Sequence, residues 1–134
     1  KHLDAWNRER RVIASRYSQA LTSMEEVHLP SVPEGSQPVF HIYALMTQRR
    51  DALRSFLHSR GIETLIHYPT PLHRQPASNK MGMDRGRYPR AEQVADSVLS
   101  LPIYPGLQQK QVDYVSDSIR SFFKTKGQTP VREK

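Results

Sequence analysis

The sequence predicts a two-layer α/β (α+β) domain with short strands and about four helices. Three observations support this prediction. Apolar residues recur at intervals of three and four near both ends of the chain, as in amphipathic helices. A nearly continuous apolar run covers residues 39–46, as in a buried strand, and Pro-rich and Gly-rich stretches separate these segments. The 134 residues are enough for one domain with one core.

The first predicted helix runs from the start of the chain to about Met24 and has one apolar face. That face consists of Leu3, Trp6, Ile13, Tyr17, Ala20, Leu21 and Met24. No capping residue precedes the pattern, so we expect the helix to begin further upstream in a longer protein. The stripe of Trp6, Ile13 and Tyr17 is interpreted as packing within the core or against another domain.

A central strand is predicted over residues 39–46, with both faces covered and with His41 as a core histidine. Thr47 can cap the helix that follows. That helix is expected to end at Gly61, since glycine is the usual residue where a chain leaves a helix in a left-handed turn. A short strand is predicted next, at residues 63–66.

The second half of the chain alternates irregular and regular segments. Residues 67–76 contain three prolines, which favour an ordered but irregular path. Residues 79–87 are polar and predict a mobile loop, and Pro89 fits the first turn of a helix. A short strand is predicted at residues 99–103, and Pro102 within it indicates an edge position.

The last amphipathic helix is predicted from Val112, Val115, Ile119, Phe122 and Phe123. Residues 124–134 carry no apolar pattern, which predicts a flexible tail.

Composition limits the possible functions. The net charge is +7, but arginines cluster in three separate segments, at positions 8–11, 49–54 and 85–90, with acidic residues interspersed. This pattern favours solvated helix faces over a nucleic-acid surface. Cysteine is absent, which excludes disulfides and thiolate metal sites. No apolar run approaches the roughly 18 residues of a membrane span, so a cytoplasmic protein without a membrane partner is expected.

Five segments, in this order and spacing, resemble the C-terminal part of the DegT/DnrJ/EryC1/StrS sugar aminotransferases. They are Leu3-Asp4-Ala5-Trp6-Asn7 with the arginines after it, Phe40-His41, Arg60-Gly61-Ile62, the run from His67 to Ala77, and the run from Leu99 to Leu107. The resemblance extends to about Phe123. It implies that residues 1–123 are the small C-terminal domain of a fold type I aminotransferase, with a short, mainly antiparallel sheet, and that the large cofactor-binding domain is absent.

The resemblance also implies an activity for the whole enzyme. Members of this family are normally homodimers that use pyridoxal phosphate to move an amino group from glutamate to a keto group on a nucleotide-linked deoxysugar. The form of the His67–Ala77 segment is similar to members that act on dTDP-3-keto-6-deoxyhexoses, and members acting at C4 remain an alternative. Two departures stand out: Gln108 replaces the usual Thr or Ser cap of the last helix, and Glu63 and Leu65 replace a glycine-rich approach to His67.

Pyridoxal phosphate requires a lysine that forms a Schiff base. In the family this lysine belongs to the large domain. None of the six lysines here has an apolar setting that would lower its pKa. We therefore expect no catalytic residue in this chain and no transamination by the isolated 134 residues, and no cofactor-binding residue is assigned.

Four residues are predicted to bind the substrate: His67, Tyr68, His73 and Gln75. Imidazole and phenol groups can donate a hydrogen bond to a hydroxyl or phosphate while covering a ring. For His73 and Gln75 an alternative is that they only pin the proline-rich loop. A metal site is not predicted, since no third ligand lies at a recognisable spacing from His67 and His73. Two other functions stay open: a stand-alone basic module that binds nucleic acid or another anionic partner, and a self-associating scaffold.

Overall fold

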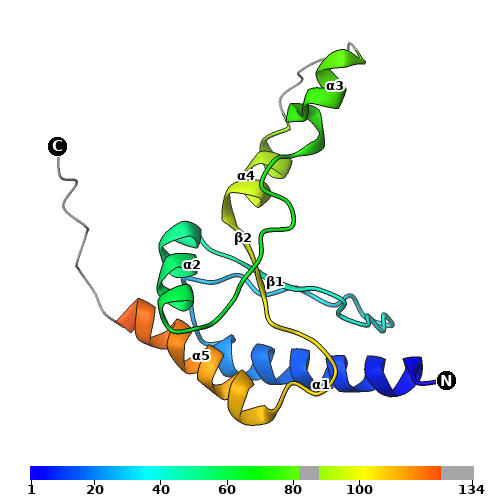
Figure 1. The fold of residues 1–134 in the computed structure, drawn as a ribbon, viewed down its shortest axis with the longest axis vertical. Helices are drawn as coiled ribbons and strands as arrows, with labels where there is room; N and C mark the ends of the chain where they lie inside the picture. Colours follow the sequence, from blue (N-terminus) through cyan, green and yellow to red (C-terminus); the bar gives the residue numbers. More distant parts are fainter. Residues whose placement is uncertain (82–87, 125–134) are drawn as a thin grey trace.

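A computed structural model describes residues 1–81 and 88–124 of the chain. The described part contains five α-helices, one short 3-10 helix and two strands (Figure 1). In chain order they are α1 (Leu3–Leu21), β1 (Tyr43–Met46), α2 (Arg50–Ser59), η1 (Leu72–Arg74), α3 (Pro76–Lys80), α4 (Pro89–Ser97), β2 (Val98–Leu101) and α5 (Gln109–Lys124). This arrangement confirms the predicted α/β class with a short antiparallel sheet.

The two strands form an antiparallel pair in which Tyr43 faces Leu101 and Met46 faces Val98. Single bridges widen this sheet on both sides, His28 to Met46 on one side and Leu65 to Ser100 on the other. Strand β2 is an edge of the two-stranded sheet, as predicted, and the bridge from Leu65 covers that edge at Ser100 only. Pro102 follows the last residue of β2, so its missing N–H group interrupts no ladder.

The predicted strand over residues 39–46 is shorter than expected. Phe40 has a φ of 50°, in the left-handed region, which breaks the extended path, so that only Tyr43–Met46 pair with β2. His41 lies in a bend and is exposed, so its assignment as a core histidine is wrong. The strand expected at residues 63–66 consists of one bridge at Leu65.

The core lies where the sheet meets α1, α2 and α5. Tyr17 of α1, Leu57 of α2, Ile119 of α5 and Leu99 of β2 are all fully buried. Burying side chains of this size stabilises the fold by roughly 1.5–3 kcal/mol each. The stripe predicted on the first helix is buried at Ile13 and Tyr17, whereas Trp6 is 46% exposed.

The ends of the helices agree only in part with the predictions from the sequence. Helix α1 has no side-chain cap, as expected, and it ends at Leu21 rather than at Met24. The N-cap of α2 is Arg49, and the helix has no side-chain cap, so the prediction that Thr47 caps it is wrong. The Thr47 hydroxyl accepts a hydrogen bond from the N–H of Arg49, before the first turn, at 3.3 Å. The chain leaves α2 through Gly61 with a φ of +73°. Lys124 belongs to α5, while residues 125–134 of the predicted tail lie outside the described residues.

Two helix ends differ from the expectations drawn from the sequence. Helix α5 begins with the Gln108 N–H donating to the Gln111 side-chain oxygen at 2.9 Å, which is the half of a capping box that the side chain three residues into the helix supplies. The side chain of Gln111, and not that of Gln108, therefore stabilises this helix start. Helix α3 extends to Lys80, inside the predicted mobile loop of residues 79–87, and residues 82–87 of that loop lie outside the described part.

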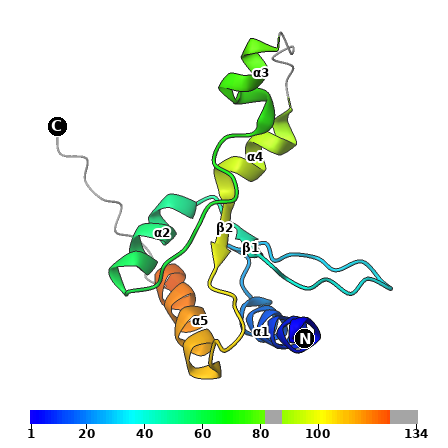
Figure 2. The ribbon, with the colours of Figure 1, turned by 45° about the vertical axis from the view of Figure 1, so that its right-hand side comes forward.

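Helices α3 and α4 extend away from the body that α1, α2 and α5 form around the sheet. Figures 1 and 2 show this from two directions, with α3 at the far end. We call the described residues 67–81 and 88–97 the arm. Helix α4 begins at Pro89, as predicted, and runs directly into β2. No helix in residues 1–81 or 88–124 is long and apolar enough to cross a membrane.

Candidate functional site

The largest described hollow lies on the arm and has a volume of about 980 Å³. One wall comes from the proline-rich segment before and within η1, and the other comes from α4. The side chains that bear on function and line it are Tyr68, His73, Gln75, Tyr88 and Arg90. Three of the four predicted substrate-binding residues therefore share one surface. The fourth, His67, is adjacent in the chain to Tyr68, and the two rings meet edge to face at 5.5 Å.

A carboxylate joins the two walls of this hollow. Glu92, in the first turn of α4, accepts a hydrogen bond from His73 Nε2 at 3.0 Å and one from Arg74 at 2.9 Å. The hydrogen bond from His73 lowers the pKa of the Glu92 carboxyl, and Arg74 acts in the same direction. The His73 ring also packs against the Tyr88 ring, with centroids 4.8 Å apart. His73 is thus held on two sides.

The sheet holds the His67 ring through a hydrogen bond from β2. Its Nδ1 atom lies 2.9 Å from the hydroxyl oxygen of Ser100, which is buried on β2. Tyr68 points into solvent and is 72% exposed. An imidazole with one nitrogen bonded to the protein, next to an exposed phenol, can offer its other nitrogen and a planar ring to a ligand.

Gln75 makes a local contact within the proline-rich segment. Its side-chain amide donates to the Thr70 carbonyl at 3.4 Å, and the Ser78 hydroxyl donates to the Leu72 carbonyl at 2.5 Å. These bonds close the turn around η1. Gln75 and His73 therefore both make contacts that shape the loop, and both side chains still line the hollow.

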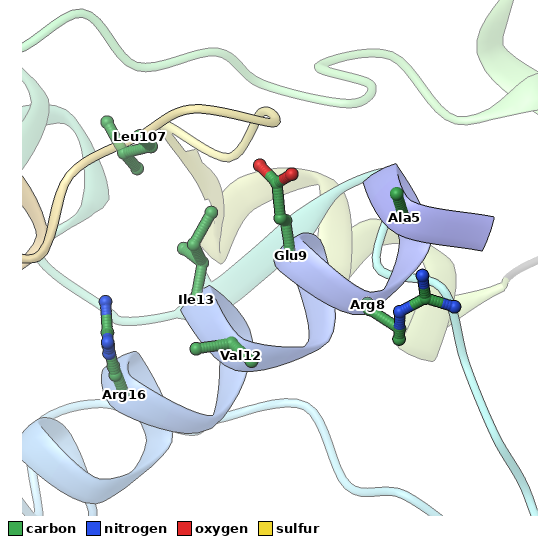
Figure 3. A pocket seen from close by; sticks show the side chains of 7 residues that line it. All are labelled: Ala5, Arg8, Glu9, Val12, Ile13, Arg16 and Leu107. Carbon is green, nitrogen blue, oxygen red and sulfur yellow. The ribbon is translucent and has the colours of Figure 1, made fainter. Parts of the chain in front are cut away.

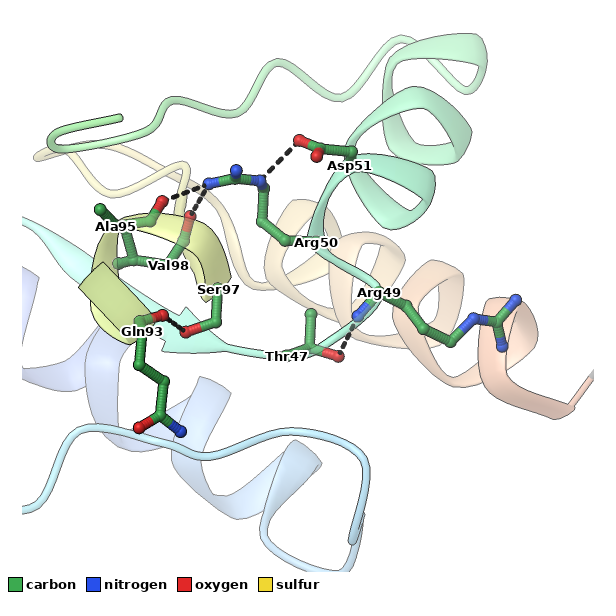
Figure 4. Close-up of polar contacts among 8 residues, drawn as sticks. All are labelled: Thr47, Arg49, Arg50, Asp51, Gln93, Ala95, Ser97 and Val98. Carbon is green, nitrogen blue, oxygen red and sulfur yellow. Dashed lines mark hydrogen bonds and ion pairs between the residues drawn. The ribbon is translucent and has the colours of Figure 1, made fainter. Parts of the chain in front are cut away.

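The arm is attached to the body through a buried arginine (Figure 4). Arg50, at the start of α2, donates from one guanidinium nitrogen to the carbonyls of Ala95 at 2.9 Å and Val98 at 3.3 Å. It also pairs with Asp51 at 2.6 Å. A cation at the carbonyl end of a helix is electrostatically favourable. Arg50 thereby fixes the junction of α4 and β2, from which the wall carrying Glu92 extends.

The described residues do not fit the requirements of a Schiff-base cofactor. Lys1, Lys80, Lys110 and Lys124 are all exposed, and none of them lines the hollow of the arm. The partly buried carboxylate at the hollow, Glu92, is already bonded to the His73 ring and to the Arg74 guanidinium. Within residues 1–81 and 88–124 there is also no group of three or more His, Cys, Asp or Glu side chains that could hold a metal ion.

A second, smaller hollow of about 320 Å³ lies along α1 (Figure 3). Arg8 and Arg16 stand at opposite ends of it, with Glu9 between them. The Glu9 carboxylate accepts a hydrogen bond from the Gly106 N–H at 2.8 Å. A fixed carboxylate between two separated guanidinium groups opposes the binding of a phosphate. This surface therefore lends no support to an anion-binding module.

Three residues of the site were missed by the sequence analysis: Glu92, Tyr88 and Ser100. Glu92 matches the common preference for an acid in the first turn of a helix, so nothing marked it as the partner of His73, 19 residues earlier. Ser100 is separated from His67 by 33 residues and lies in a short apolar strand. The pairing of Leu65 with Ser100 brings these segments together in the fold.

The chain is similar in sequence to known proteins over most of its length. The model of the DegT/DnrJ/EryC1/StrS aminotransferase family matches residues 1–120. The dTDP-3-amino-3,4,6-trideoxy-alpha-D-glucose transaminase of Streptomyces venezuelae is 43% identical over 90% of this chain and 32% of its own length. A pleiotropic regulatory protein of Geobacillus stearothermophilus is 38% identical over 92% of this chain and 34% of its own.

The fold has a close counterpart among solved structures. The crystal structure of S. venezuelae DesV in complex with a ketimine intermediate matches with a TM-score of 0.86 and 43% identity, over 90% of this chain and 33% of that one. The chain thus spans about a third of the length of the relatives it matches.

Proposed function

Since the chain belongs to the DegT/DnrJ/EryC1/StrS aminotransferase family, we propose that residues 1–123 are the C-terminal small domain of a pyridoxal-phosphate-dependent sugar aminotransferase. In the proposed net reaction the amino group of glutamate replaces the keto oxygen of a nucleotide-linked keto-deoxysugar, and glutamate leaves as 2-oxoglutarate. A dTDP-3-keto-6-deoxyhexose is the proposed substrate class. The support for it is the 43% identity to a transaminase whose name carries a dTDP-linked 3-amino sugar.

The observation that carries the proposal is the grouping of the substrate-binding candidates on one surface. Tyr68, His73 and Gln75 line the hollow of the arm, and His67 adjoins it with one ring nitrogen bonded to Ser100. His67 would bond a hydroxyl or phosphate oxygen of the sugar nucleotide. The exposed ring of Tyr68 would cover the flat face of a sugar or base. His73, held by Glu92 of the α4 wall, would shape the same wall as Tyr68.

The cofactor is proposed to be held elsewhere in the protein. When bound, pyridoxal phosphate supplies the carbonyl carbon to which an amino group is transferred and the electron sink for the bonds that break. The described residues that line the hollow of the arm include neither a lysine nor a carboxylate for it, so the contribution of this chain is to bind and orient the sugar. On the same grounds we propose that the 134 residues alone do not transaminate. From membership of the family we propose that the whole enzyme is a homodimer.

The test is steady-state kinetics of the native gene product with pyridoxal phosphate, glutamate and a dTDP-3-keto-6-deoxyhexose. We expect His67→Ala to raise the KM for the sugar by about tenfold, the equivalent of one or two lost hydrogen bonds. His58→Ala is the matched control, since His58 is 72% exposed on α2 and pairs with Glu63 away from the arm. Equal KM values for the two variants would refute the substrate role of His67.

A further inference from the structure

We propose that Ser100 is a positioning residue, whose hydroxyl sets the orientation of the His67 ring so that Nε2 faces the substrate. The inference rests on the proposed function, since it requires that His67 binds the sugar nucleotide. It adds a residue from the interior of the sheet, which would touch no ligand and would act only through His67.

The main chain fixes the distance between the two residues. The Ser100 N–H donates to the Leu65 carbonyl at 2.8 Å, and the Leu65 N–H donates to the Ser100 carbonyl at 3.2 Å. This closely bonded pair ties the segment ending at His67 to β2, two residues before the imidazole. The bond of 2.9 Å between Ser100 Oγ and His67 Nδ1 is a third link at the same place. Because Ser100 is only 5% exposed, water does not compete effectively for its hydroxyl.

The chemistry of the pair suits a positioning role. A serine hydroxyl both donates and accepts, so it can bond Nδ1 whether or not that nitrogen carries a proton. The ring therefore keeps one orientation in both neutral tautomers and in the charged form. Within the described part of the chain, Nε2 of His67 has no hydrogen-bond partner, which leaves it for a ligand.

Loss of the hydroxyl would release the ring. The torsion between Cβ and an imidazole ring has a broad, roughly two-fold profile, so local sterics alone do not distinguish the two flipped orientations. A flip carries Nδ1 and Nε2 to the opposite sides of the ring. Without Ser100 Oγ, the binding nitrogen would occupy the correct position for only part of the time, and sugar affinity would fall.

The experiment is a double-mutant cycle on the native gene product, with KM for the dTDP-linked keto-sugar and kcat measured separately. Ser100→Ala is expected to raise this KM about fivefold, the effect of one hydrogen bond, with kcat and the KM for glutamate unchanged within about twofold. In the His67→Ala background Ser100→Ala should add nothing. Ser100→Thr, which keeps the hydroxyl, should restore the KM to within about twofold of the starting protein.

Ser97→Ala is the matched control. Ser97 is 4% exposed, and its hydroxyl donates to the Gln93 carbonyl at 2.7 Å, so this variant loses a buried hydroxyl without touching an imidazole. Thermal melting of each variant checks that it is folded. The positioning role alone would be overturned if His67→Ala raised the KM for the keto-sugar while Ser100→Ala left this KM unchanged. It would also be overturned if Ser100→Ala raised the KM by the same factor with and without His67→Ala. No effect of His67→Ala would overturn the proposed function and this inference together.

Discussion

Replacing Arg50 with methionine removes the link between α2 and the junction of α4 with β2. The guanidinium of Arg50 is almost completely enclosed, and it donates to the Ala95 and Val98 carbonyls (Figure 4). Methionine keeps most of the apolar stem and loses the donors. Both carbonyls then lose a charged partner inside the protein, and α4 loses its attachment at the end from which the arm projects.

The size of the effect follows from these contacts. A hydrogen bond from a charged group contributes about 1.5 kcal/mol or more, so the two bonds to carbonyls together stabilise the fold by about 3 kcal/mol. The pair with Asp51 adds little, since the Asp51 side chain is 81% exposed and solvent screens it. For a domain of this size, about 3 kcal/mol corresponds to a fall in Tm of roughly 10 °C.

The assay is urea unfolding followed by circular dichroism, which compares midpoints at equal slopes. Arg54→Met is the control, because Arg54 is exposed on the same helix and undergoes the same chemical change. Arg50→Lys keeps the charge without the planar fork and should fall between the two. Equal midpoints for Arg50→Met and Arg54→Met would refute the reasoning that Arg50 holds the arm.

Three further predictions concern the core, a turn and the site. Burial raises the pKa of Tyr17, so above pH about 10 the folded protein keeps a proton that the unfolded chain loses. The free energy of unfolding should therefore fall as pH rises above about 10. The same titration of Tyr17→Phe should show a shallower fall. Gly61→Ala should cost about 1 kcal/mol in thermal unfolding, since a Cβ there meets no atom within 4 Å and only the left-handed φ opposes it. Glu92→Gln should speed tryptic cleavage after Arg74 at neutral pH, because the ion pair that holds Arg74 against α4 is lost. An unchanged cleavage rate would contradict the conclusion that Glu92 fixes η1.

The helices could be predicted from the sequence because each carries its own periodic pattern. The last helix and the Gly61 turn were placed closely, since apolar spacing and the conformational freedom of glycine are local properties. The strands were predicted less well. The length of β1 depends on what pairs with it, and Phe40 ends the extended path where a run of apolar letters continues. His41 was placed in the core by the same error.

The residues of the candidate site were also predicted only in part. His67, Tyr68, His73 and Gln75 were found together because they are close in sequence and lie in a motif that resembles a known family. Their partners come from elsewhere. Glu92 reaches His73 because α4 packs beside η1, and the spacing of the two residues in the sequence does not predict that contact. The fold therefore had to be known before the wall opposite His73 could be named.

The central claim, that this chain is the sugar-binding small domain of an aminotransferase, is tested most directly by one transamination assay. The native gene product and the purified 134-residue chain are each incubated with pyridoxal phosphate, glutamate and a dTDP-3-keto-6-deoxyhexose, and the amino sugar is measured by mass spectrometry. We predict glutamate-dependent amino sugar from the native gene product and none from the 134 residues alone. Amination by the 134-residue chain, or its absence with the native gene product, would contradict the account.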